Sequence, residues 1–159
     1  MTRMLLLAIC LCMPASAQTE EDHDHHLSEG AGLRALHAWT PATTSDTAMV
    51  YVELENITAE PVTLDGAETG LAETAHLVGF ELKNGEAVYT VLPPMPLAPG
   101  REMHLEPEGM AIRLTGLARG LAEGETFEMH LETSLGEIGL FVSVEAANAG
   151  HHGHAGHTH

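Results

Sequence analysis

Beyond residue 17 this sequence has no cysteine, and the whole chain is poor in aromatic and basic residues. Its two cysteines, Cys10 and Cys12, lie near the start, which excludes disulfides and thiolate metal sites from the rest of the chain. Lys and Arg number 6 against 23 Asp and Glu, and the formal net charge is −17. Nucleic acids and anionic membranes require a basic face, so we expect neither as a partner.

Long hydrophobic runs are also missing, apart from a short one near the start. Residues 4–13 are apolar but too few to span a membrane, and they lie between Arg3 and the small-residue sequence ASA that ends at Ala17. This order is typical of a cleaved secretory signal. We therefore expect a signal peptide at 1–17, no membrane insertion and a periplasmic product. No lipid anchor is expected, because neither cysteine follows the small residue that a lipoprotein signal requires.

Catalytic motifs are absent as well. The sequence contains no Gly-x-Ser-x-Gly, no phosphate-binding glycine loop and no His-Glu-x-x-His. No cysteine nucleophile remains once the signal is removed. We therefore expect a binding protein and not an enzyme.

What the sequence does contain is a series of short segments in which apolar and polar residues alternate. Successive side chains of a strand point to opposite sides, so this alternation predicts strands. Asn84-Gly85 predicts a tight hairpin turn, and 92–100 reads as a proline-rich crossing. Eight or nine such strands predict an all-β fold, an antiparallel Greek-key β-sandwich. The clearest strands are 47–55, 101–105, 110–115, 126–133 and 137–145.

The strands occupy one domain, residues 33–146, and each side of it carries a polar segment. Residues 18–32 and 147–159 are rich in histidine and show no hydrophobic periodicity. We therefore expect both to be disordered tails.

Several segments of the domain together match one family pattern. They are HAWTP at 37–41, AMVYVELEN at 48–56, the turns at Pro99-Gly100 and Gly109, Gly116-Leu117 and LAEGE at 121–125. On these residues the chain resembles the periplasmic copper chaperones of the PCu(A)C family. The resemblance implies a cupredoxin-like sandwich, copper as the bound ion, and a copper-receiving oxidase subunit or another copper chaperone as partner.

The resemblance also implies where copper would bind. Family members hold Cu(I) through the pattern His-x10-Met-x21-His-x-Met, and the matching positions here are Val78, Tyr89, Ala111 and Arg113. None of these is the thioether or imidazole that suits soft Cu(I). His76 would replace the first histidine only if the hairpin were two residues longer. We therefore expect this Cu(I) site to be lost.

Three other residues of the domain are candidate metal ligands. Met110 offers sulfur, but strand alternation turns it toward the core, where Met commonly packs. His104 and His130 are the central residues of two copies of EMHLE, at 102–106 and 128–132. If the two strands lie side by side, the imidazoles and carboxylates form a Zn²⁺ or Cu²⁺ site. The alternative is that both are ordinary exposed histidines.

The stronger metal signal lies in the two tails. Neutral imidazole is the commonest transition-metal ligand, and histidine-rich tracts are typical of metal binding. By general affinity order we expect copper as Cu²⁺, with Cu(I) and zinc as alternatives. The eight tail histidines are His23, His25, His26, His151, His152, His154, His157 and His159.

These observations predict an extracytoplasmic metal-binding protein, a copper chaperone or copper buffer. Two other functions remain open. One is a zinc-binding scavenger or buffer, and the other is an adaptor module that kept the fold and binds no metal.

Overall fold

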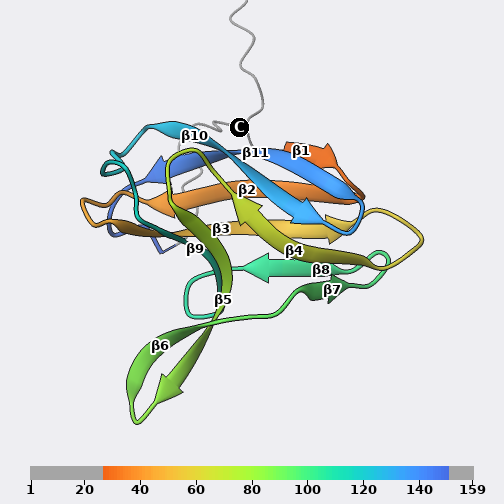
Figure 1. The fold of residues 1–159 in the computed structure, drawn as a ribbon, viewed down its shortest axis with the longest axis horizontal. Helices are drawn as coiled ribbons and strands as arrows, with labels where there is room; N and C mark the ends of the chain where they lie inside the picture. Colours follow the sequence, from red (N-terminus) through yellow and green to blue (C-terminus); the bar gives the residue numbers. More distant parts are fainter. Residues whose placement is uncertain (1–26, 151–159) are drawn as a thin grey trace, which may run out of the picture.

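The computed structural model describes residues 27–150, which form eleven β-strands and no helix (Figure 1). The predicted all-β fold is confirmed. In this part of the chain nothing helical has the length and apolar character that crossing a membrane requires. The strands are β1 (Leu27–Gly30), β2 (Leu33–Pro41), β3 (Thr47–Asn56), β4 (Val62–Glu68), β5 (Thr74–Lys83), β6 (Glu86–Val91), β7 (Met95–Leu97), β8 (Glu102–Leu105), β9 (Met110–Thr115), β10 (Thr126–Thr133) and β11 (Gly136–Glu145).

The strands are hydrogen-bonded in the order β6-β5-β9-β8-β3-β2-β11-β10-β4-β7, with β1 paired to β2. Two pairings are parallel, β11 with β2 and β8 with β9, and the others are antiparallel. The sheet is therefore mixed, whereas the sequence predicted a purely antiparallel one. The β2–β11 pairing brings together the two ends of the domain, and such a distant pairing leaves no signal in local alternation.

Nearly all the strands turn one face toward a single hydrophobic core. On β10 the buried residues are Phe127, Met129 and Leu131, as the alternation predicted. Burial of one large apolar side chain stabilises a fold by about 1.5–3 kcal/mol. The inward residues therefore fix each strand's orientation, and the opposite face of β10 carries the polar residues Glu128, His130 and Glu132.

The Asn84-Gly85 turn has the geometry that its sequence predicts. Asn84 has φ 55° and Gly85 has φ 84°, and two consecutive positive φ values characterise the type I′ turn that matches strand twist. The β5–β6 hairpin that it closes projects away from the rest of the molecule (Figure 1). Leu82, near its tip, is 68% exposed.

Two sequence predictions are wrong at the level of single segments. Part of the expected disordered tail, Leu27–Gly30, is strand β1; it pairs with β2, and Glu29 forms an ion pair with Arg34 at 2.7 Å. The proline-rich crossing contains β7, which pairs with β4. Its buried Leu97 accepts a hydrogen bond of 2.8 Å from the Asn56 amide. The predicted signal peptide and the remainder of 18–32 up to residue 26 lie outside the described residues.

Candidate functional site

The positions at which the resemblance places copper ligands do come together in space. Val78 on β5 lies directly opposite Ala111 on β9, and neither has exposed surface. They pack with Trp39 of β2 and Tyr51 of β3 into a second hydrophobic cluster, separate from the main core. We call these four residues the tryptophan cluster. Val78 and Ala111, at two of the positions that hold copper in the family pattern, are thus enclosed by packed side chains.

Aromatic contacts dominate this cluster. The rings of Trp39 and Tyr51 lie 4.9 Å apart between centroids and are tilted by 44°. Tyr89 packs against the cluster from β6 and contacts Phe80 edge-on at 5.5 Å. Burial raises the pKa of Tyr51 to about 12, and the neighbouring Tyr89 adds to the effect. The surroundings of this cluster therefore favour neutral, apolar groups and disfavour a charged group such as a metal ion.

Arg113 occupies the middle of a row of three residues on adjacent strands. Met49 lies opposite it on β3 and His76 lies opposite it on β5. Its Nη1 donates a hydrogen bond of 3.3 Å to the Tyr89 carbonyl oxygen. By strand register a residue with a fixed positive charge therefore separates a methionine from a histidine in this row. Together with Val78, Tyr89 and Ala111, it does not fit the ligand set of a Cu(I) site.

The single-residue candidates are dispersed over the fold. His76 is exposed on β5 and is not part of the tryptophan cluster. Met110 is half-buried and packs against the main core, as expected. His104 is exposed on β8, with one ring nitrogen 3.3 Å from Glu102.

The hypothesis that His104 and His130 share a site is wrong. β8 and β10 are separated in the sheet by β3, β2 and β11. His130 instead lies beside Glu68 of β4 and Glu137 of β11. Neither glutamate is part of a motif that the sequence marks as a metal site. No local signal could have found them, because strand pairing alone brings them to His130.

The tail candidates lie outside the described residues. They are His23, His25, His26, His151, His152, His154, His157 and His159. Their role in metal binding stays a prediction.

Comparisons with known proteins point to one family. A family model described as lipoprotein LpqE-like matches residues 33–138, most of the chain. No curated protein sequence matches significantly.

Solved structures share the fold. The apo PmoF2 PCuAC domain has a TM-score of 0.65 at 20% identity, covering 79% of this chain and 99% of that one. The copper-bound PCuAC domain from PmoF2 has a TM-score of 0.64 at 19% identity, with coverages of 76% and 98%. CuI-DR1885 from Deinococcus radiodurans has a TM-score of 0.56 at 26% identity, covering 71% and 78%. The predicted cupredoxin-like fold is confirmed.

Proposed function

Because the chain belongs to the LpqE-like family, we propose that it is an extracytoplasmic copper-binding protein, acting as a chaperone or buffer and not as an enzyme. The observation that carries this proposal is the fold it shares with a copper-bound PCuAC domain and with CuI-DR1885. The apolar start of the sequence and its small-residue cleavage pattern support a place outside the cytoplasm. The cargo would be handed to a copper-receiving oxidase subunit or to another copper chaperone.

The donor set decides which form of copper the chain would carry. The four positions named by the resemblance offer no thioether and no imidazole, and Arg113 adds a positive charge there. The chain still holds 12 histidines, eight of them in the tails. Imidazole nitrogen with nearby carboxylate oxygen favours Cu²⁺ over Cu(I), and Cu²⁺ over Zn²⁺. We therefore place most of the copper capacity on the tail histidines.

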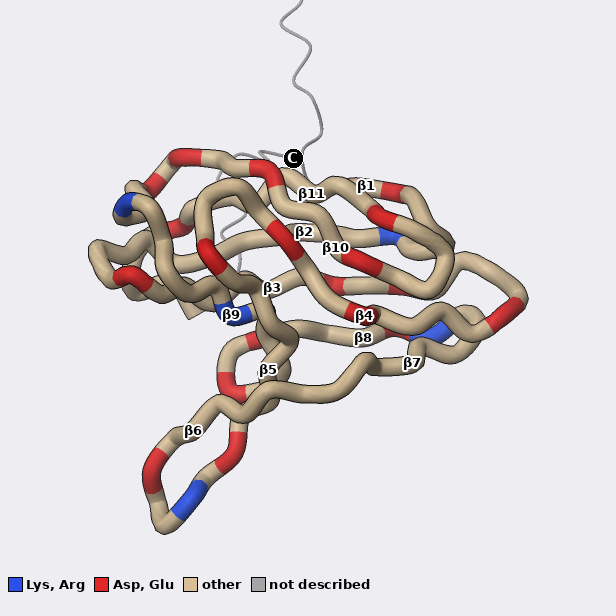
Figure 2. Tube along the Cα trace, viewed as in Figure 1, with Lys and Arg blue, Asp and Glu red and all other residues tan. Residues whose placement is uncertain are grey.

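The charge of the chain suits this role. A formal net charge of −17 raises the local concentration of cations. Acidic segments are spread over the strands, and basic ones are few (Figure 2). Because protons compete for imidazole below about pH 6.5, copper would be held at neutral pH and released on acidification.

Equilibrium titration of the mature chain with Cu²⁺, Cu(I) and Zn²⁺ tests the proposal. The test variant replaces all eight tail histidines by glutamine, and the matched control carries His37→Gln and His76→Gln. We expect the test variant to lose most of its Cu²⁺ capacity and the control to keep it. Unchanged capacity in the test variant contradicts the tail assignment, and tight Cu(I) binding by that variant indicates a sulfur site in the folded domain. A preference for Zn²⁺ favours the zinc buffer, and no binding by the unsubstituted mature chain favours the adaptor.

A further inference from the structure

His130 lies at the centre of a group of acidic side chains on the outward face of β10. β10 is hydrogen-bonded to β4 on one side and to β11 on the other. Glu68 of β4 and Gly139 of β11 lie directly opposite His130. Glu137 reaches the same ring from β11. Gly139 has no side chain, and the His130 ring and the Glu128 carboxylate lie next to it, 3.6–3.8 Å from where a Cβ would stand.

One glutamate orients the imidazole. Nε2 of His130 lies 3.2 Å from Oε1 of Glu128, two residues earlier on the same strand. An ionised carboxylate only accepts hydrogen bonds, so a neutral imidazole must carry its proton on Nε2. Its lone pair is then on Nδ1. A carboxylate that fixes the second ring nitrogen in this way is the usual partner of a metal-binding histidine.

Two further carboxylates face the free nitrogen. Nδ1 of His130 lies 3.8 Å from Oε2 of Glu137 and 4.0 Å from Oε1 of Glu68. The three ligand atoms lie within 4.8 Å of one another, the one such group among residues 27–150. Zn²⁺ binds His nitrogen and carboxylate oxygen at about 2.0–2.2 Å, so two ligands of a tetrahedral ion lie about 3.4 Å apart. The two carboxylate oxygens are now 3.8 and 4.0 Å from Nδ1. Small rotations of these exposed glutamate side chains would bring them to the separation that a bound ion requires.

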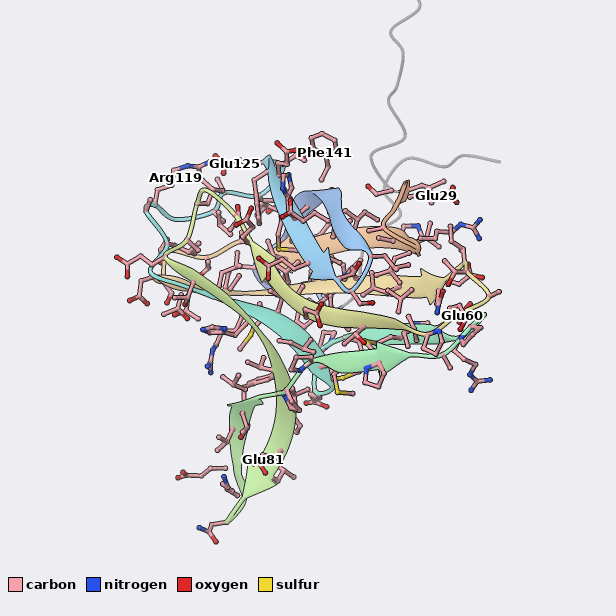
Figure 3. The ribbon with its side chains drawn as sticks, turned by 45° about the vertical axis from the view of Figure 1, so that its right-hand side comes forward. Glu29, Glu60, Glu81, Arg119, Glu125 and Phe141 are labelled. Atoms are coloured by element: carbon pink, nitrogen blue, oxygen red, sulfur yellow. The ribbon has the colours of Figure 1, made fainter. Side chains whose placement is uncertain are left out.

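Within residues 27–150 no Lys or Arg side chain is paired with these carboxylates. Among the described residues, the ion pairs of Glu68, Glu128 and Glu137 all lead to His130. Arg119 lines the pocket beside His130, but its Nη1 is bound to Glu125 at 2.7 Å. Figure 3 shows Arg119 and Glu125 next to each other at the edge of the domain. The group therefore carries a net negative charge that a divalent cation would offset.

We propose that Glu68, His130 and Glu137 bind a divalent transition-metal cation of the Zn²⁺ or Cu²⁺ type, with Glu128 as the positioning residue of the imidazole. One nitrogen and two oxygen ligands suit these borderline cations, and the absence of sulfur from the set disfavours Cu(I). Three protein ligands leave a coordination position for water or for a ligand from another molecule. The site is built by the folded domain, and it does not depend on the tail histidines.

The test uses the full mature chain in which all eight tail histidines are glutamine, so that the tails add no imidazole. Zn²⁺ and Cu²⁺ are titrated against a chromophoric chelator. We expect about one equivalent to bind. His130→Gln, Glu68→Gln and Glu137→Gln should each weaken binding about tenfold or more, and Glu128→Gln by about 10- to 100-fold.

His104→Gln is the matched control, because His104 has the same EMHLE surroundings in sequence and lies 3.3 Å from Glu102. It should leave the affinity unchanged. Calorimetry in two buffers adds a second measurement: Zn²⁺ should displace protons from the group, and His130→Gln should remove that release. Circular dichroism checks that each variant folds.

Three results overturn the proposal. They are an absence of bound Zn²⁺ and Cu²⁺ in the tail-substituted chain, unchanged affinity in a folded His130→Gln variant, and an equal loss in His104→Gln. None of them contradicts the tail assignment, which fails only if the tail substitutions leave the Cu²⁺ capacity of the mature chain unchanged.

Discussion

The tryptophan cluster and the group around His130 have opposite chemistry. In the cluster, Trp39 and Tyr51 are 5% and 6% exposed, and Val78 and Ala111 are fully buried. Around His130 the side chains are 38–64% exposed and every ligand atom is nitrogen or oxygen. The tryptophan cluster therefore contributes to packing, whereas the group around His130 presents side chains that can bind a cation. Substitutions in the cluster should change stability, and substitutions around His130 should change metal affinity.

The largest expected effect is on stability, from Trp39→Ala. Truncating a buried Trp costs about 3–5 kcal/mol of unfolding free energy. His130→Gln should stay within about 0.5 kcal/mol, because the site is on the surface. Denaturant unfolding of both variants without metal measures the difference. Similar losses of unfolding free energy in the two variants would contradict the assignment of packing to the cluster and binding to the His130 group. A loss of Zn²⁺ affinity in folded Trp39→Ala protein would contradict it as well.

The next effect concerns the pKa of Tyr51 and tests whether the tryptophan cluster is closed to solvent. Burial and the nearby Tyr89 raise the pKa of Tyr51 to about 12. The folded pKa of Tyr51 thus lies above the unfolded value of about 10. The contribution of the neutral, buried phenol to the free energy of unfolding is therefore complete below pH 10 and is lost as the pH rises toward 12. The chain has two tyrosines, so Tyr89→Phe leaves Tyr51 as the one titrating phenol. Its tyrosinate absorbance should show a pKa below that in the parent and above 10; a midpoint of 10 would mean an open cluster.

The smallest effect concerns the proton on His130. The hydrogen-bonded Glu128 raises the pKa of His130, with charge from Glu137 and Glu68 adding to it and partial burial opposing it. Because the folded pKa is raised, this contribution to stability is complete below about pH 6.5 and is lost as pH rises through the folded pKa. Titration of the ring by NMR should show a raised midpoint, lower in Glu128→Gln than in the parent. Equal midpoints in the two would contradict the orienting role of Glu128.

Local alternation was enough to predict the main core. The inward residues of β10 and β11 are buried as expected, and Asn84-Gly85 forms the expected turn. Alternation along 47–55 puts Tyr51 on the same side as Glu53 and Glu55, which favours a solvent-facing residue, so the sequence does not predict the tryptophan cluster. The burial of Tyr51 depends on Trp39 and Val78, which come from other strands. Such a second buried face has no signature within one strand.

The two EMHLE segments show this limit most clearly. They have identical sequences, and in both the Met and Leu point into the core. His104 lies opposite Glu53 on β3, whereas His130 lies between Glu68 and the β11 strand that carries Glu137. One histidine therefore has a group of potential ligands around it, and its copy does not. The difference arises from strand order, which the pentapeptide does not encode.

X-ray absorption at the copper edge of the full mature chain, loaded with Cu²⁺ at neutral pH, tests the central claim most directly. Five of the eight methionines follow residue 17, so the mature chain offers thioether sulfur to the metal. We predict a coordination shell of nitrogen and oxygen only, with the multiple scattering typical of imidazole. A copper–sulfur contribution would show that methionine holds the metal, and would contradict the assignment of copper to imidazole and carboxylate groups.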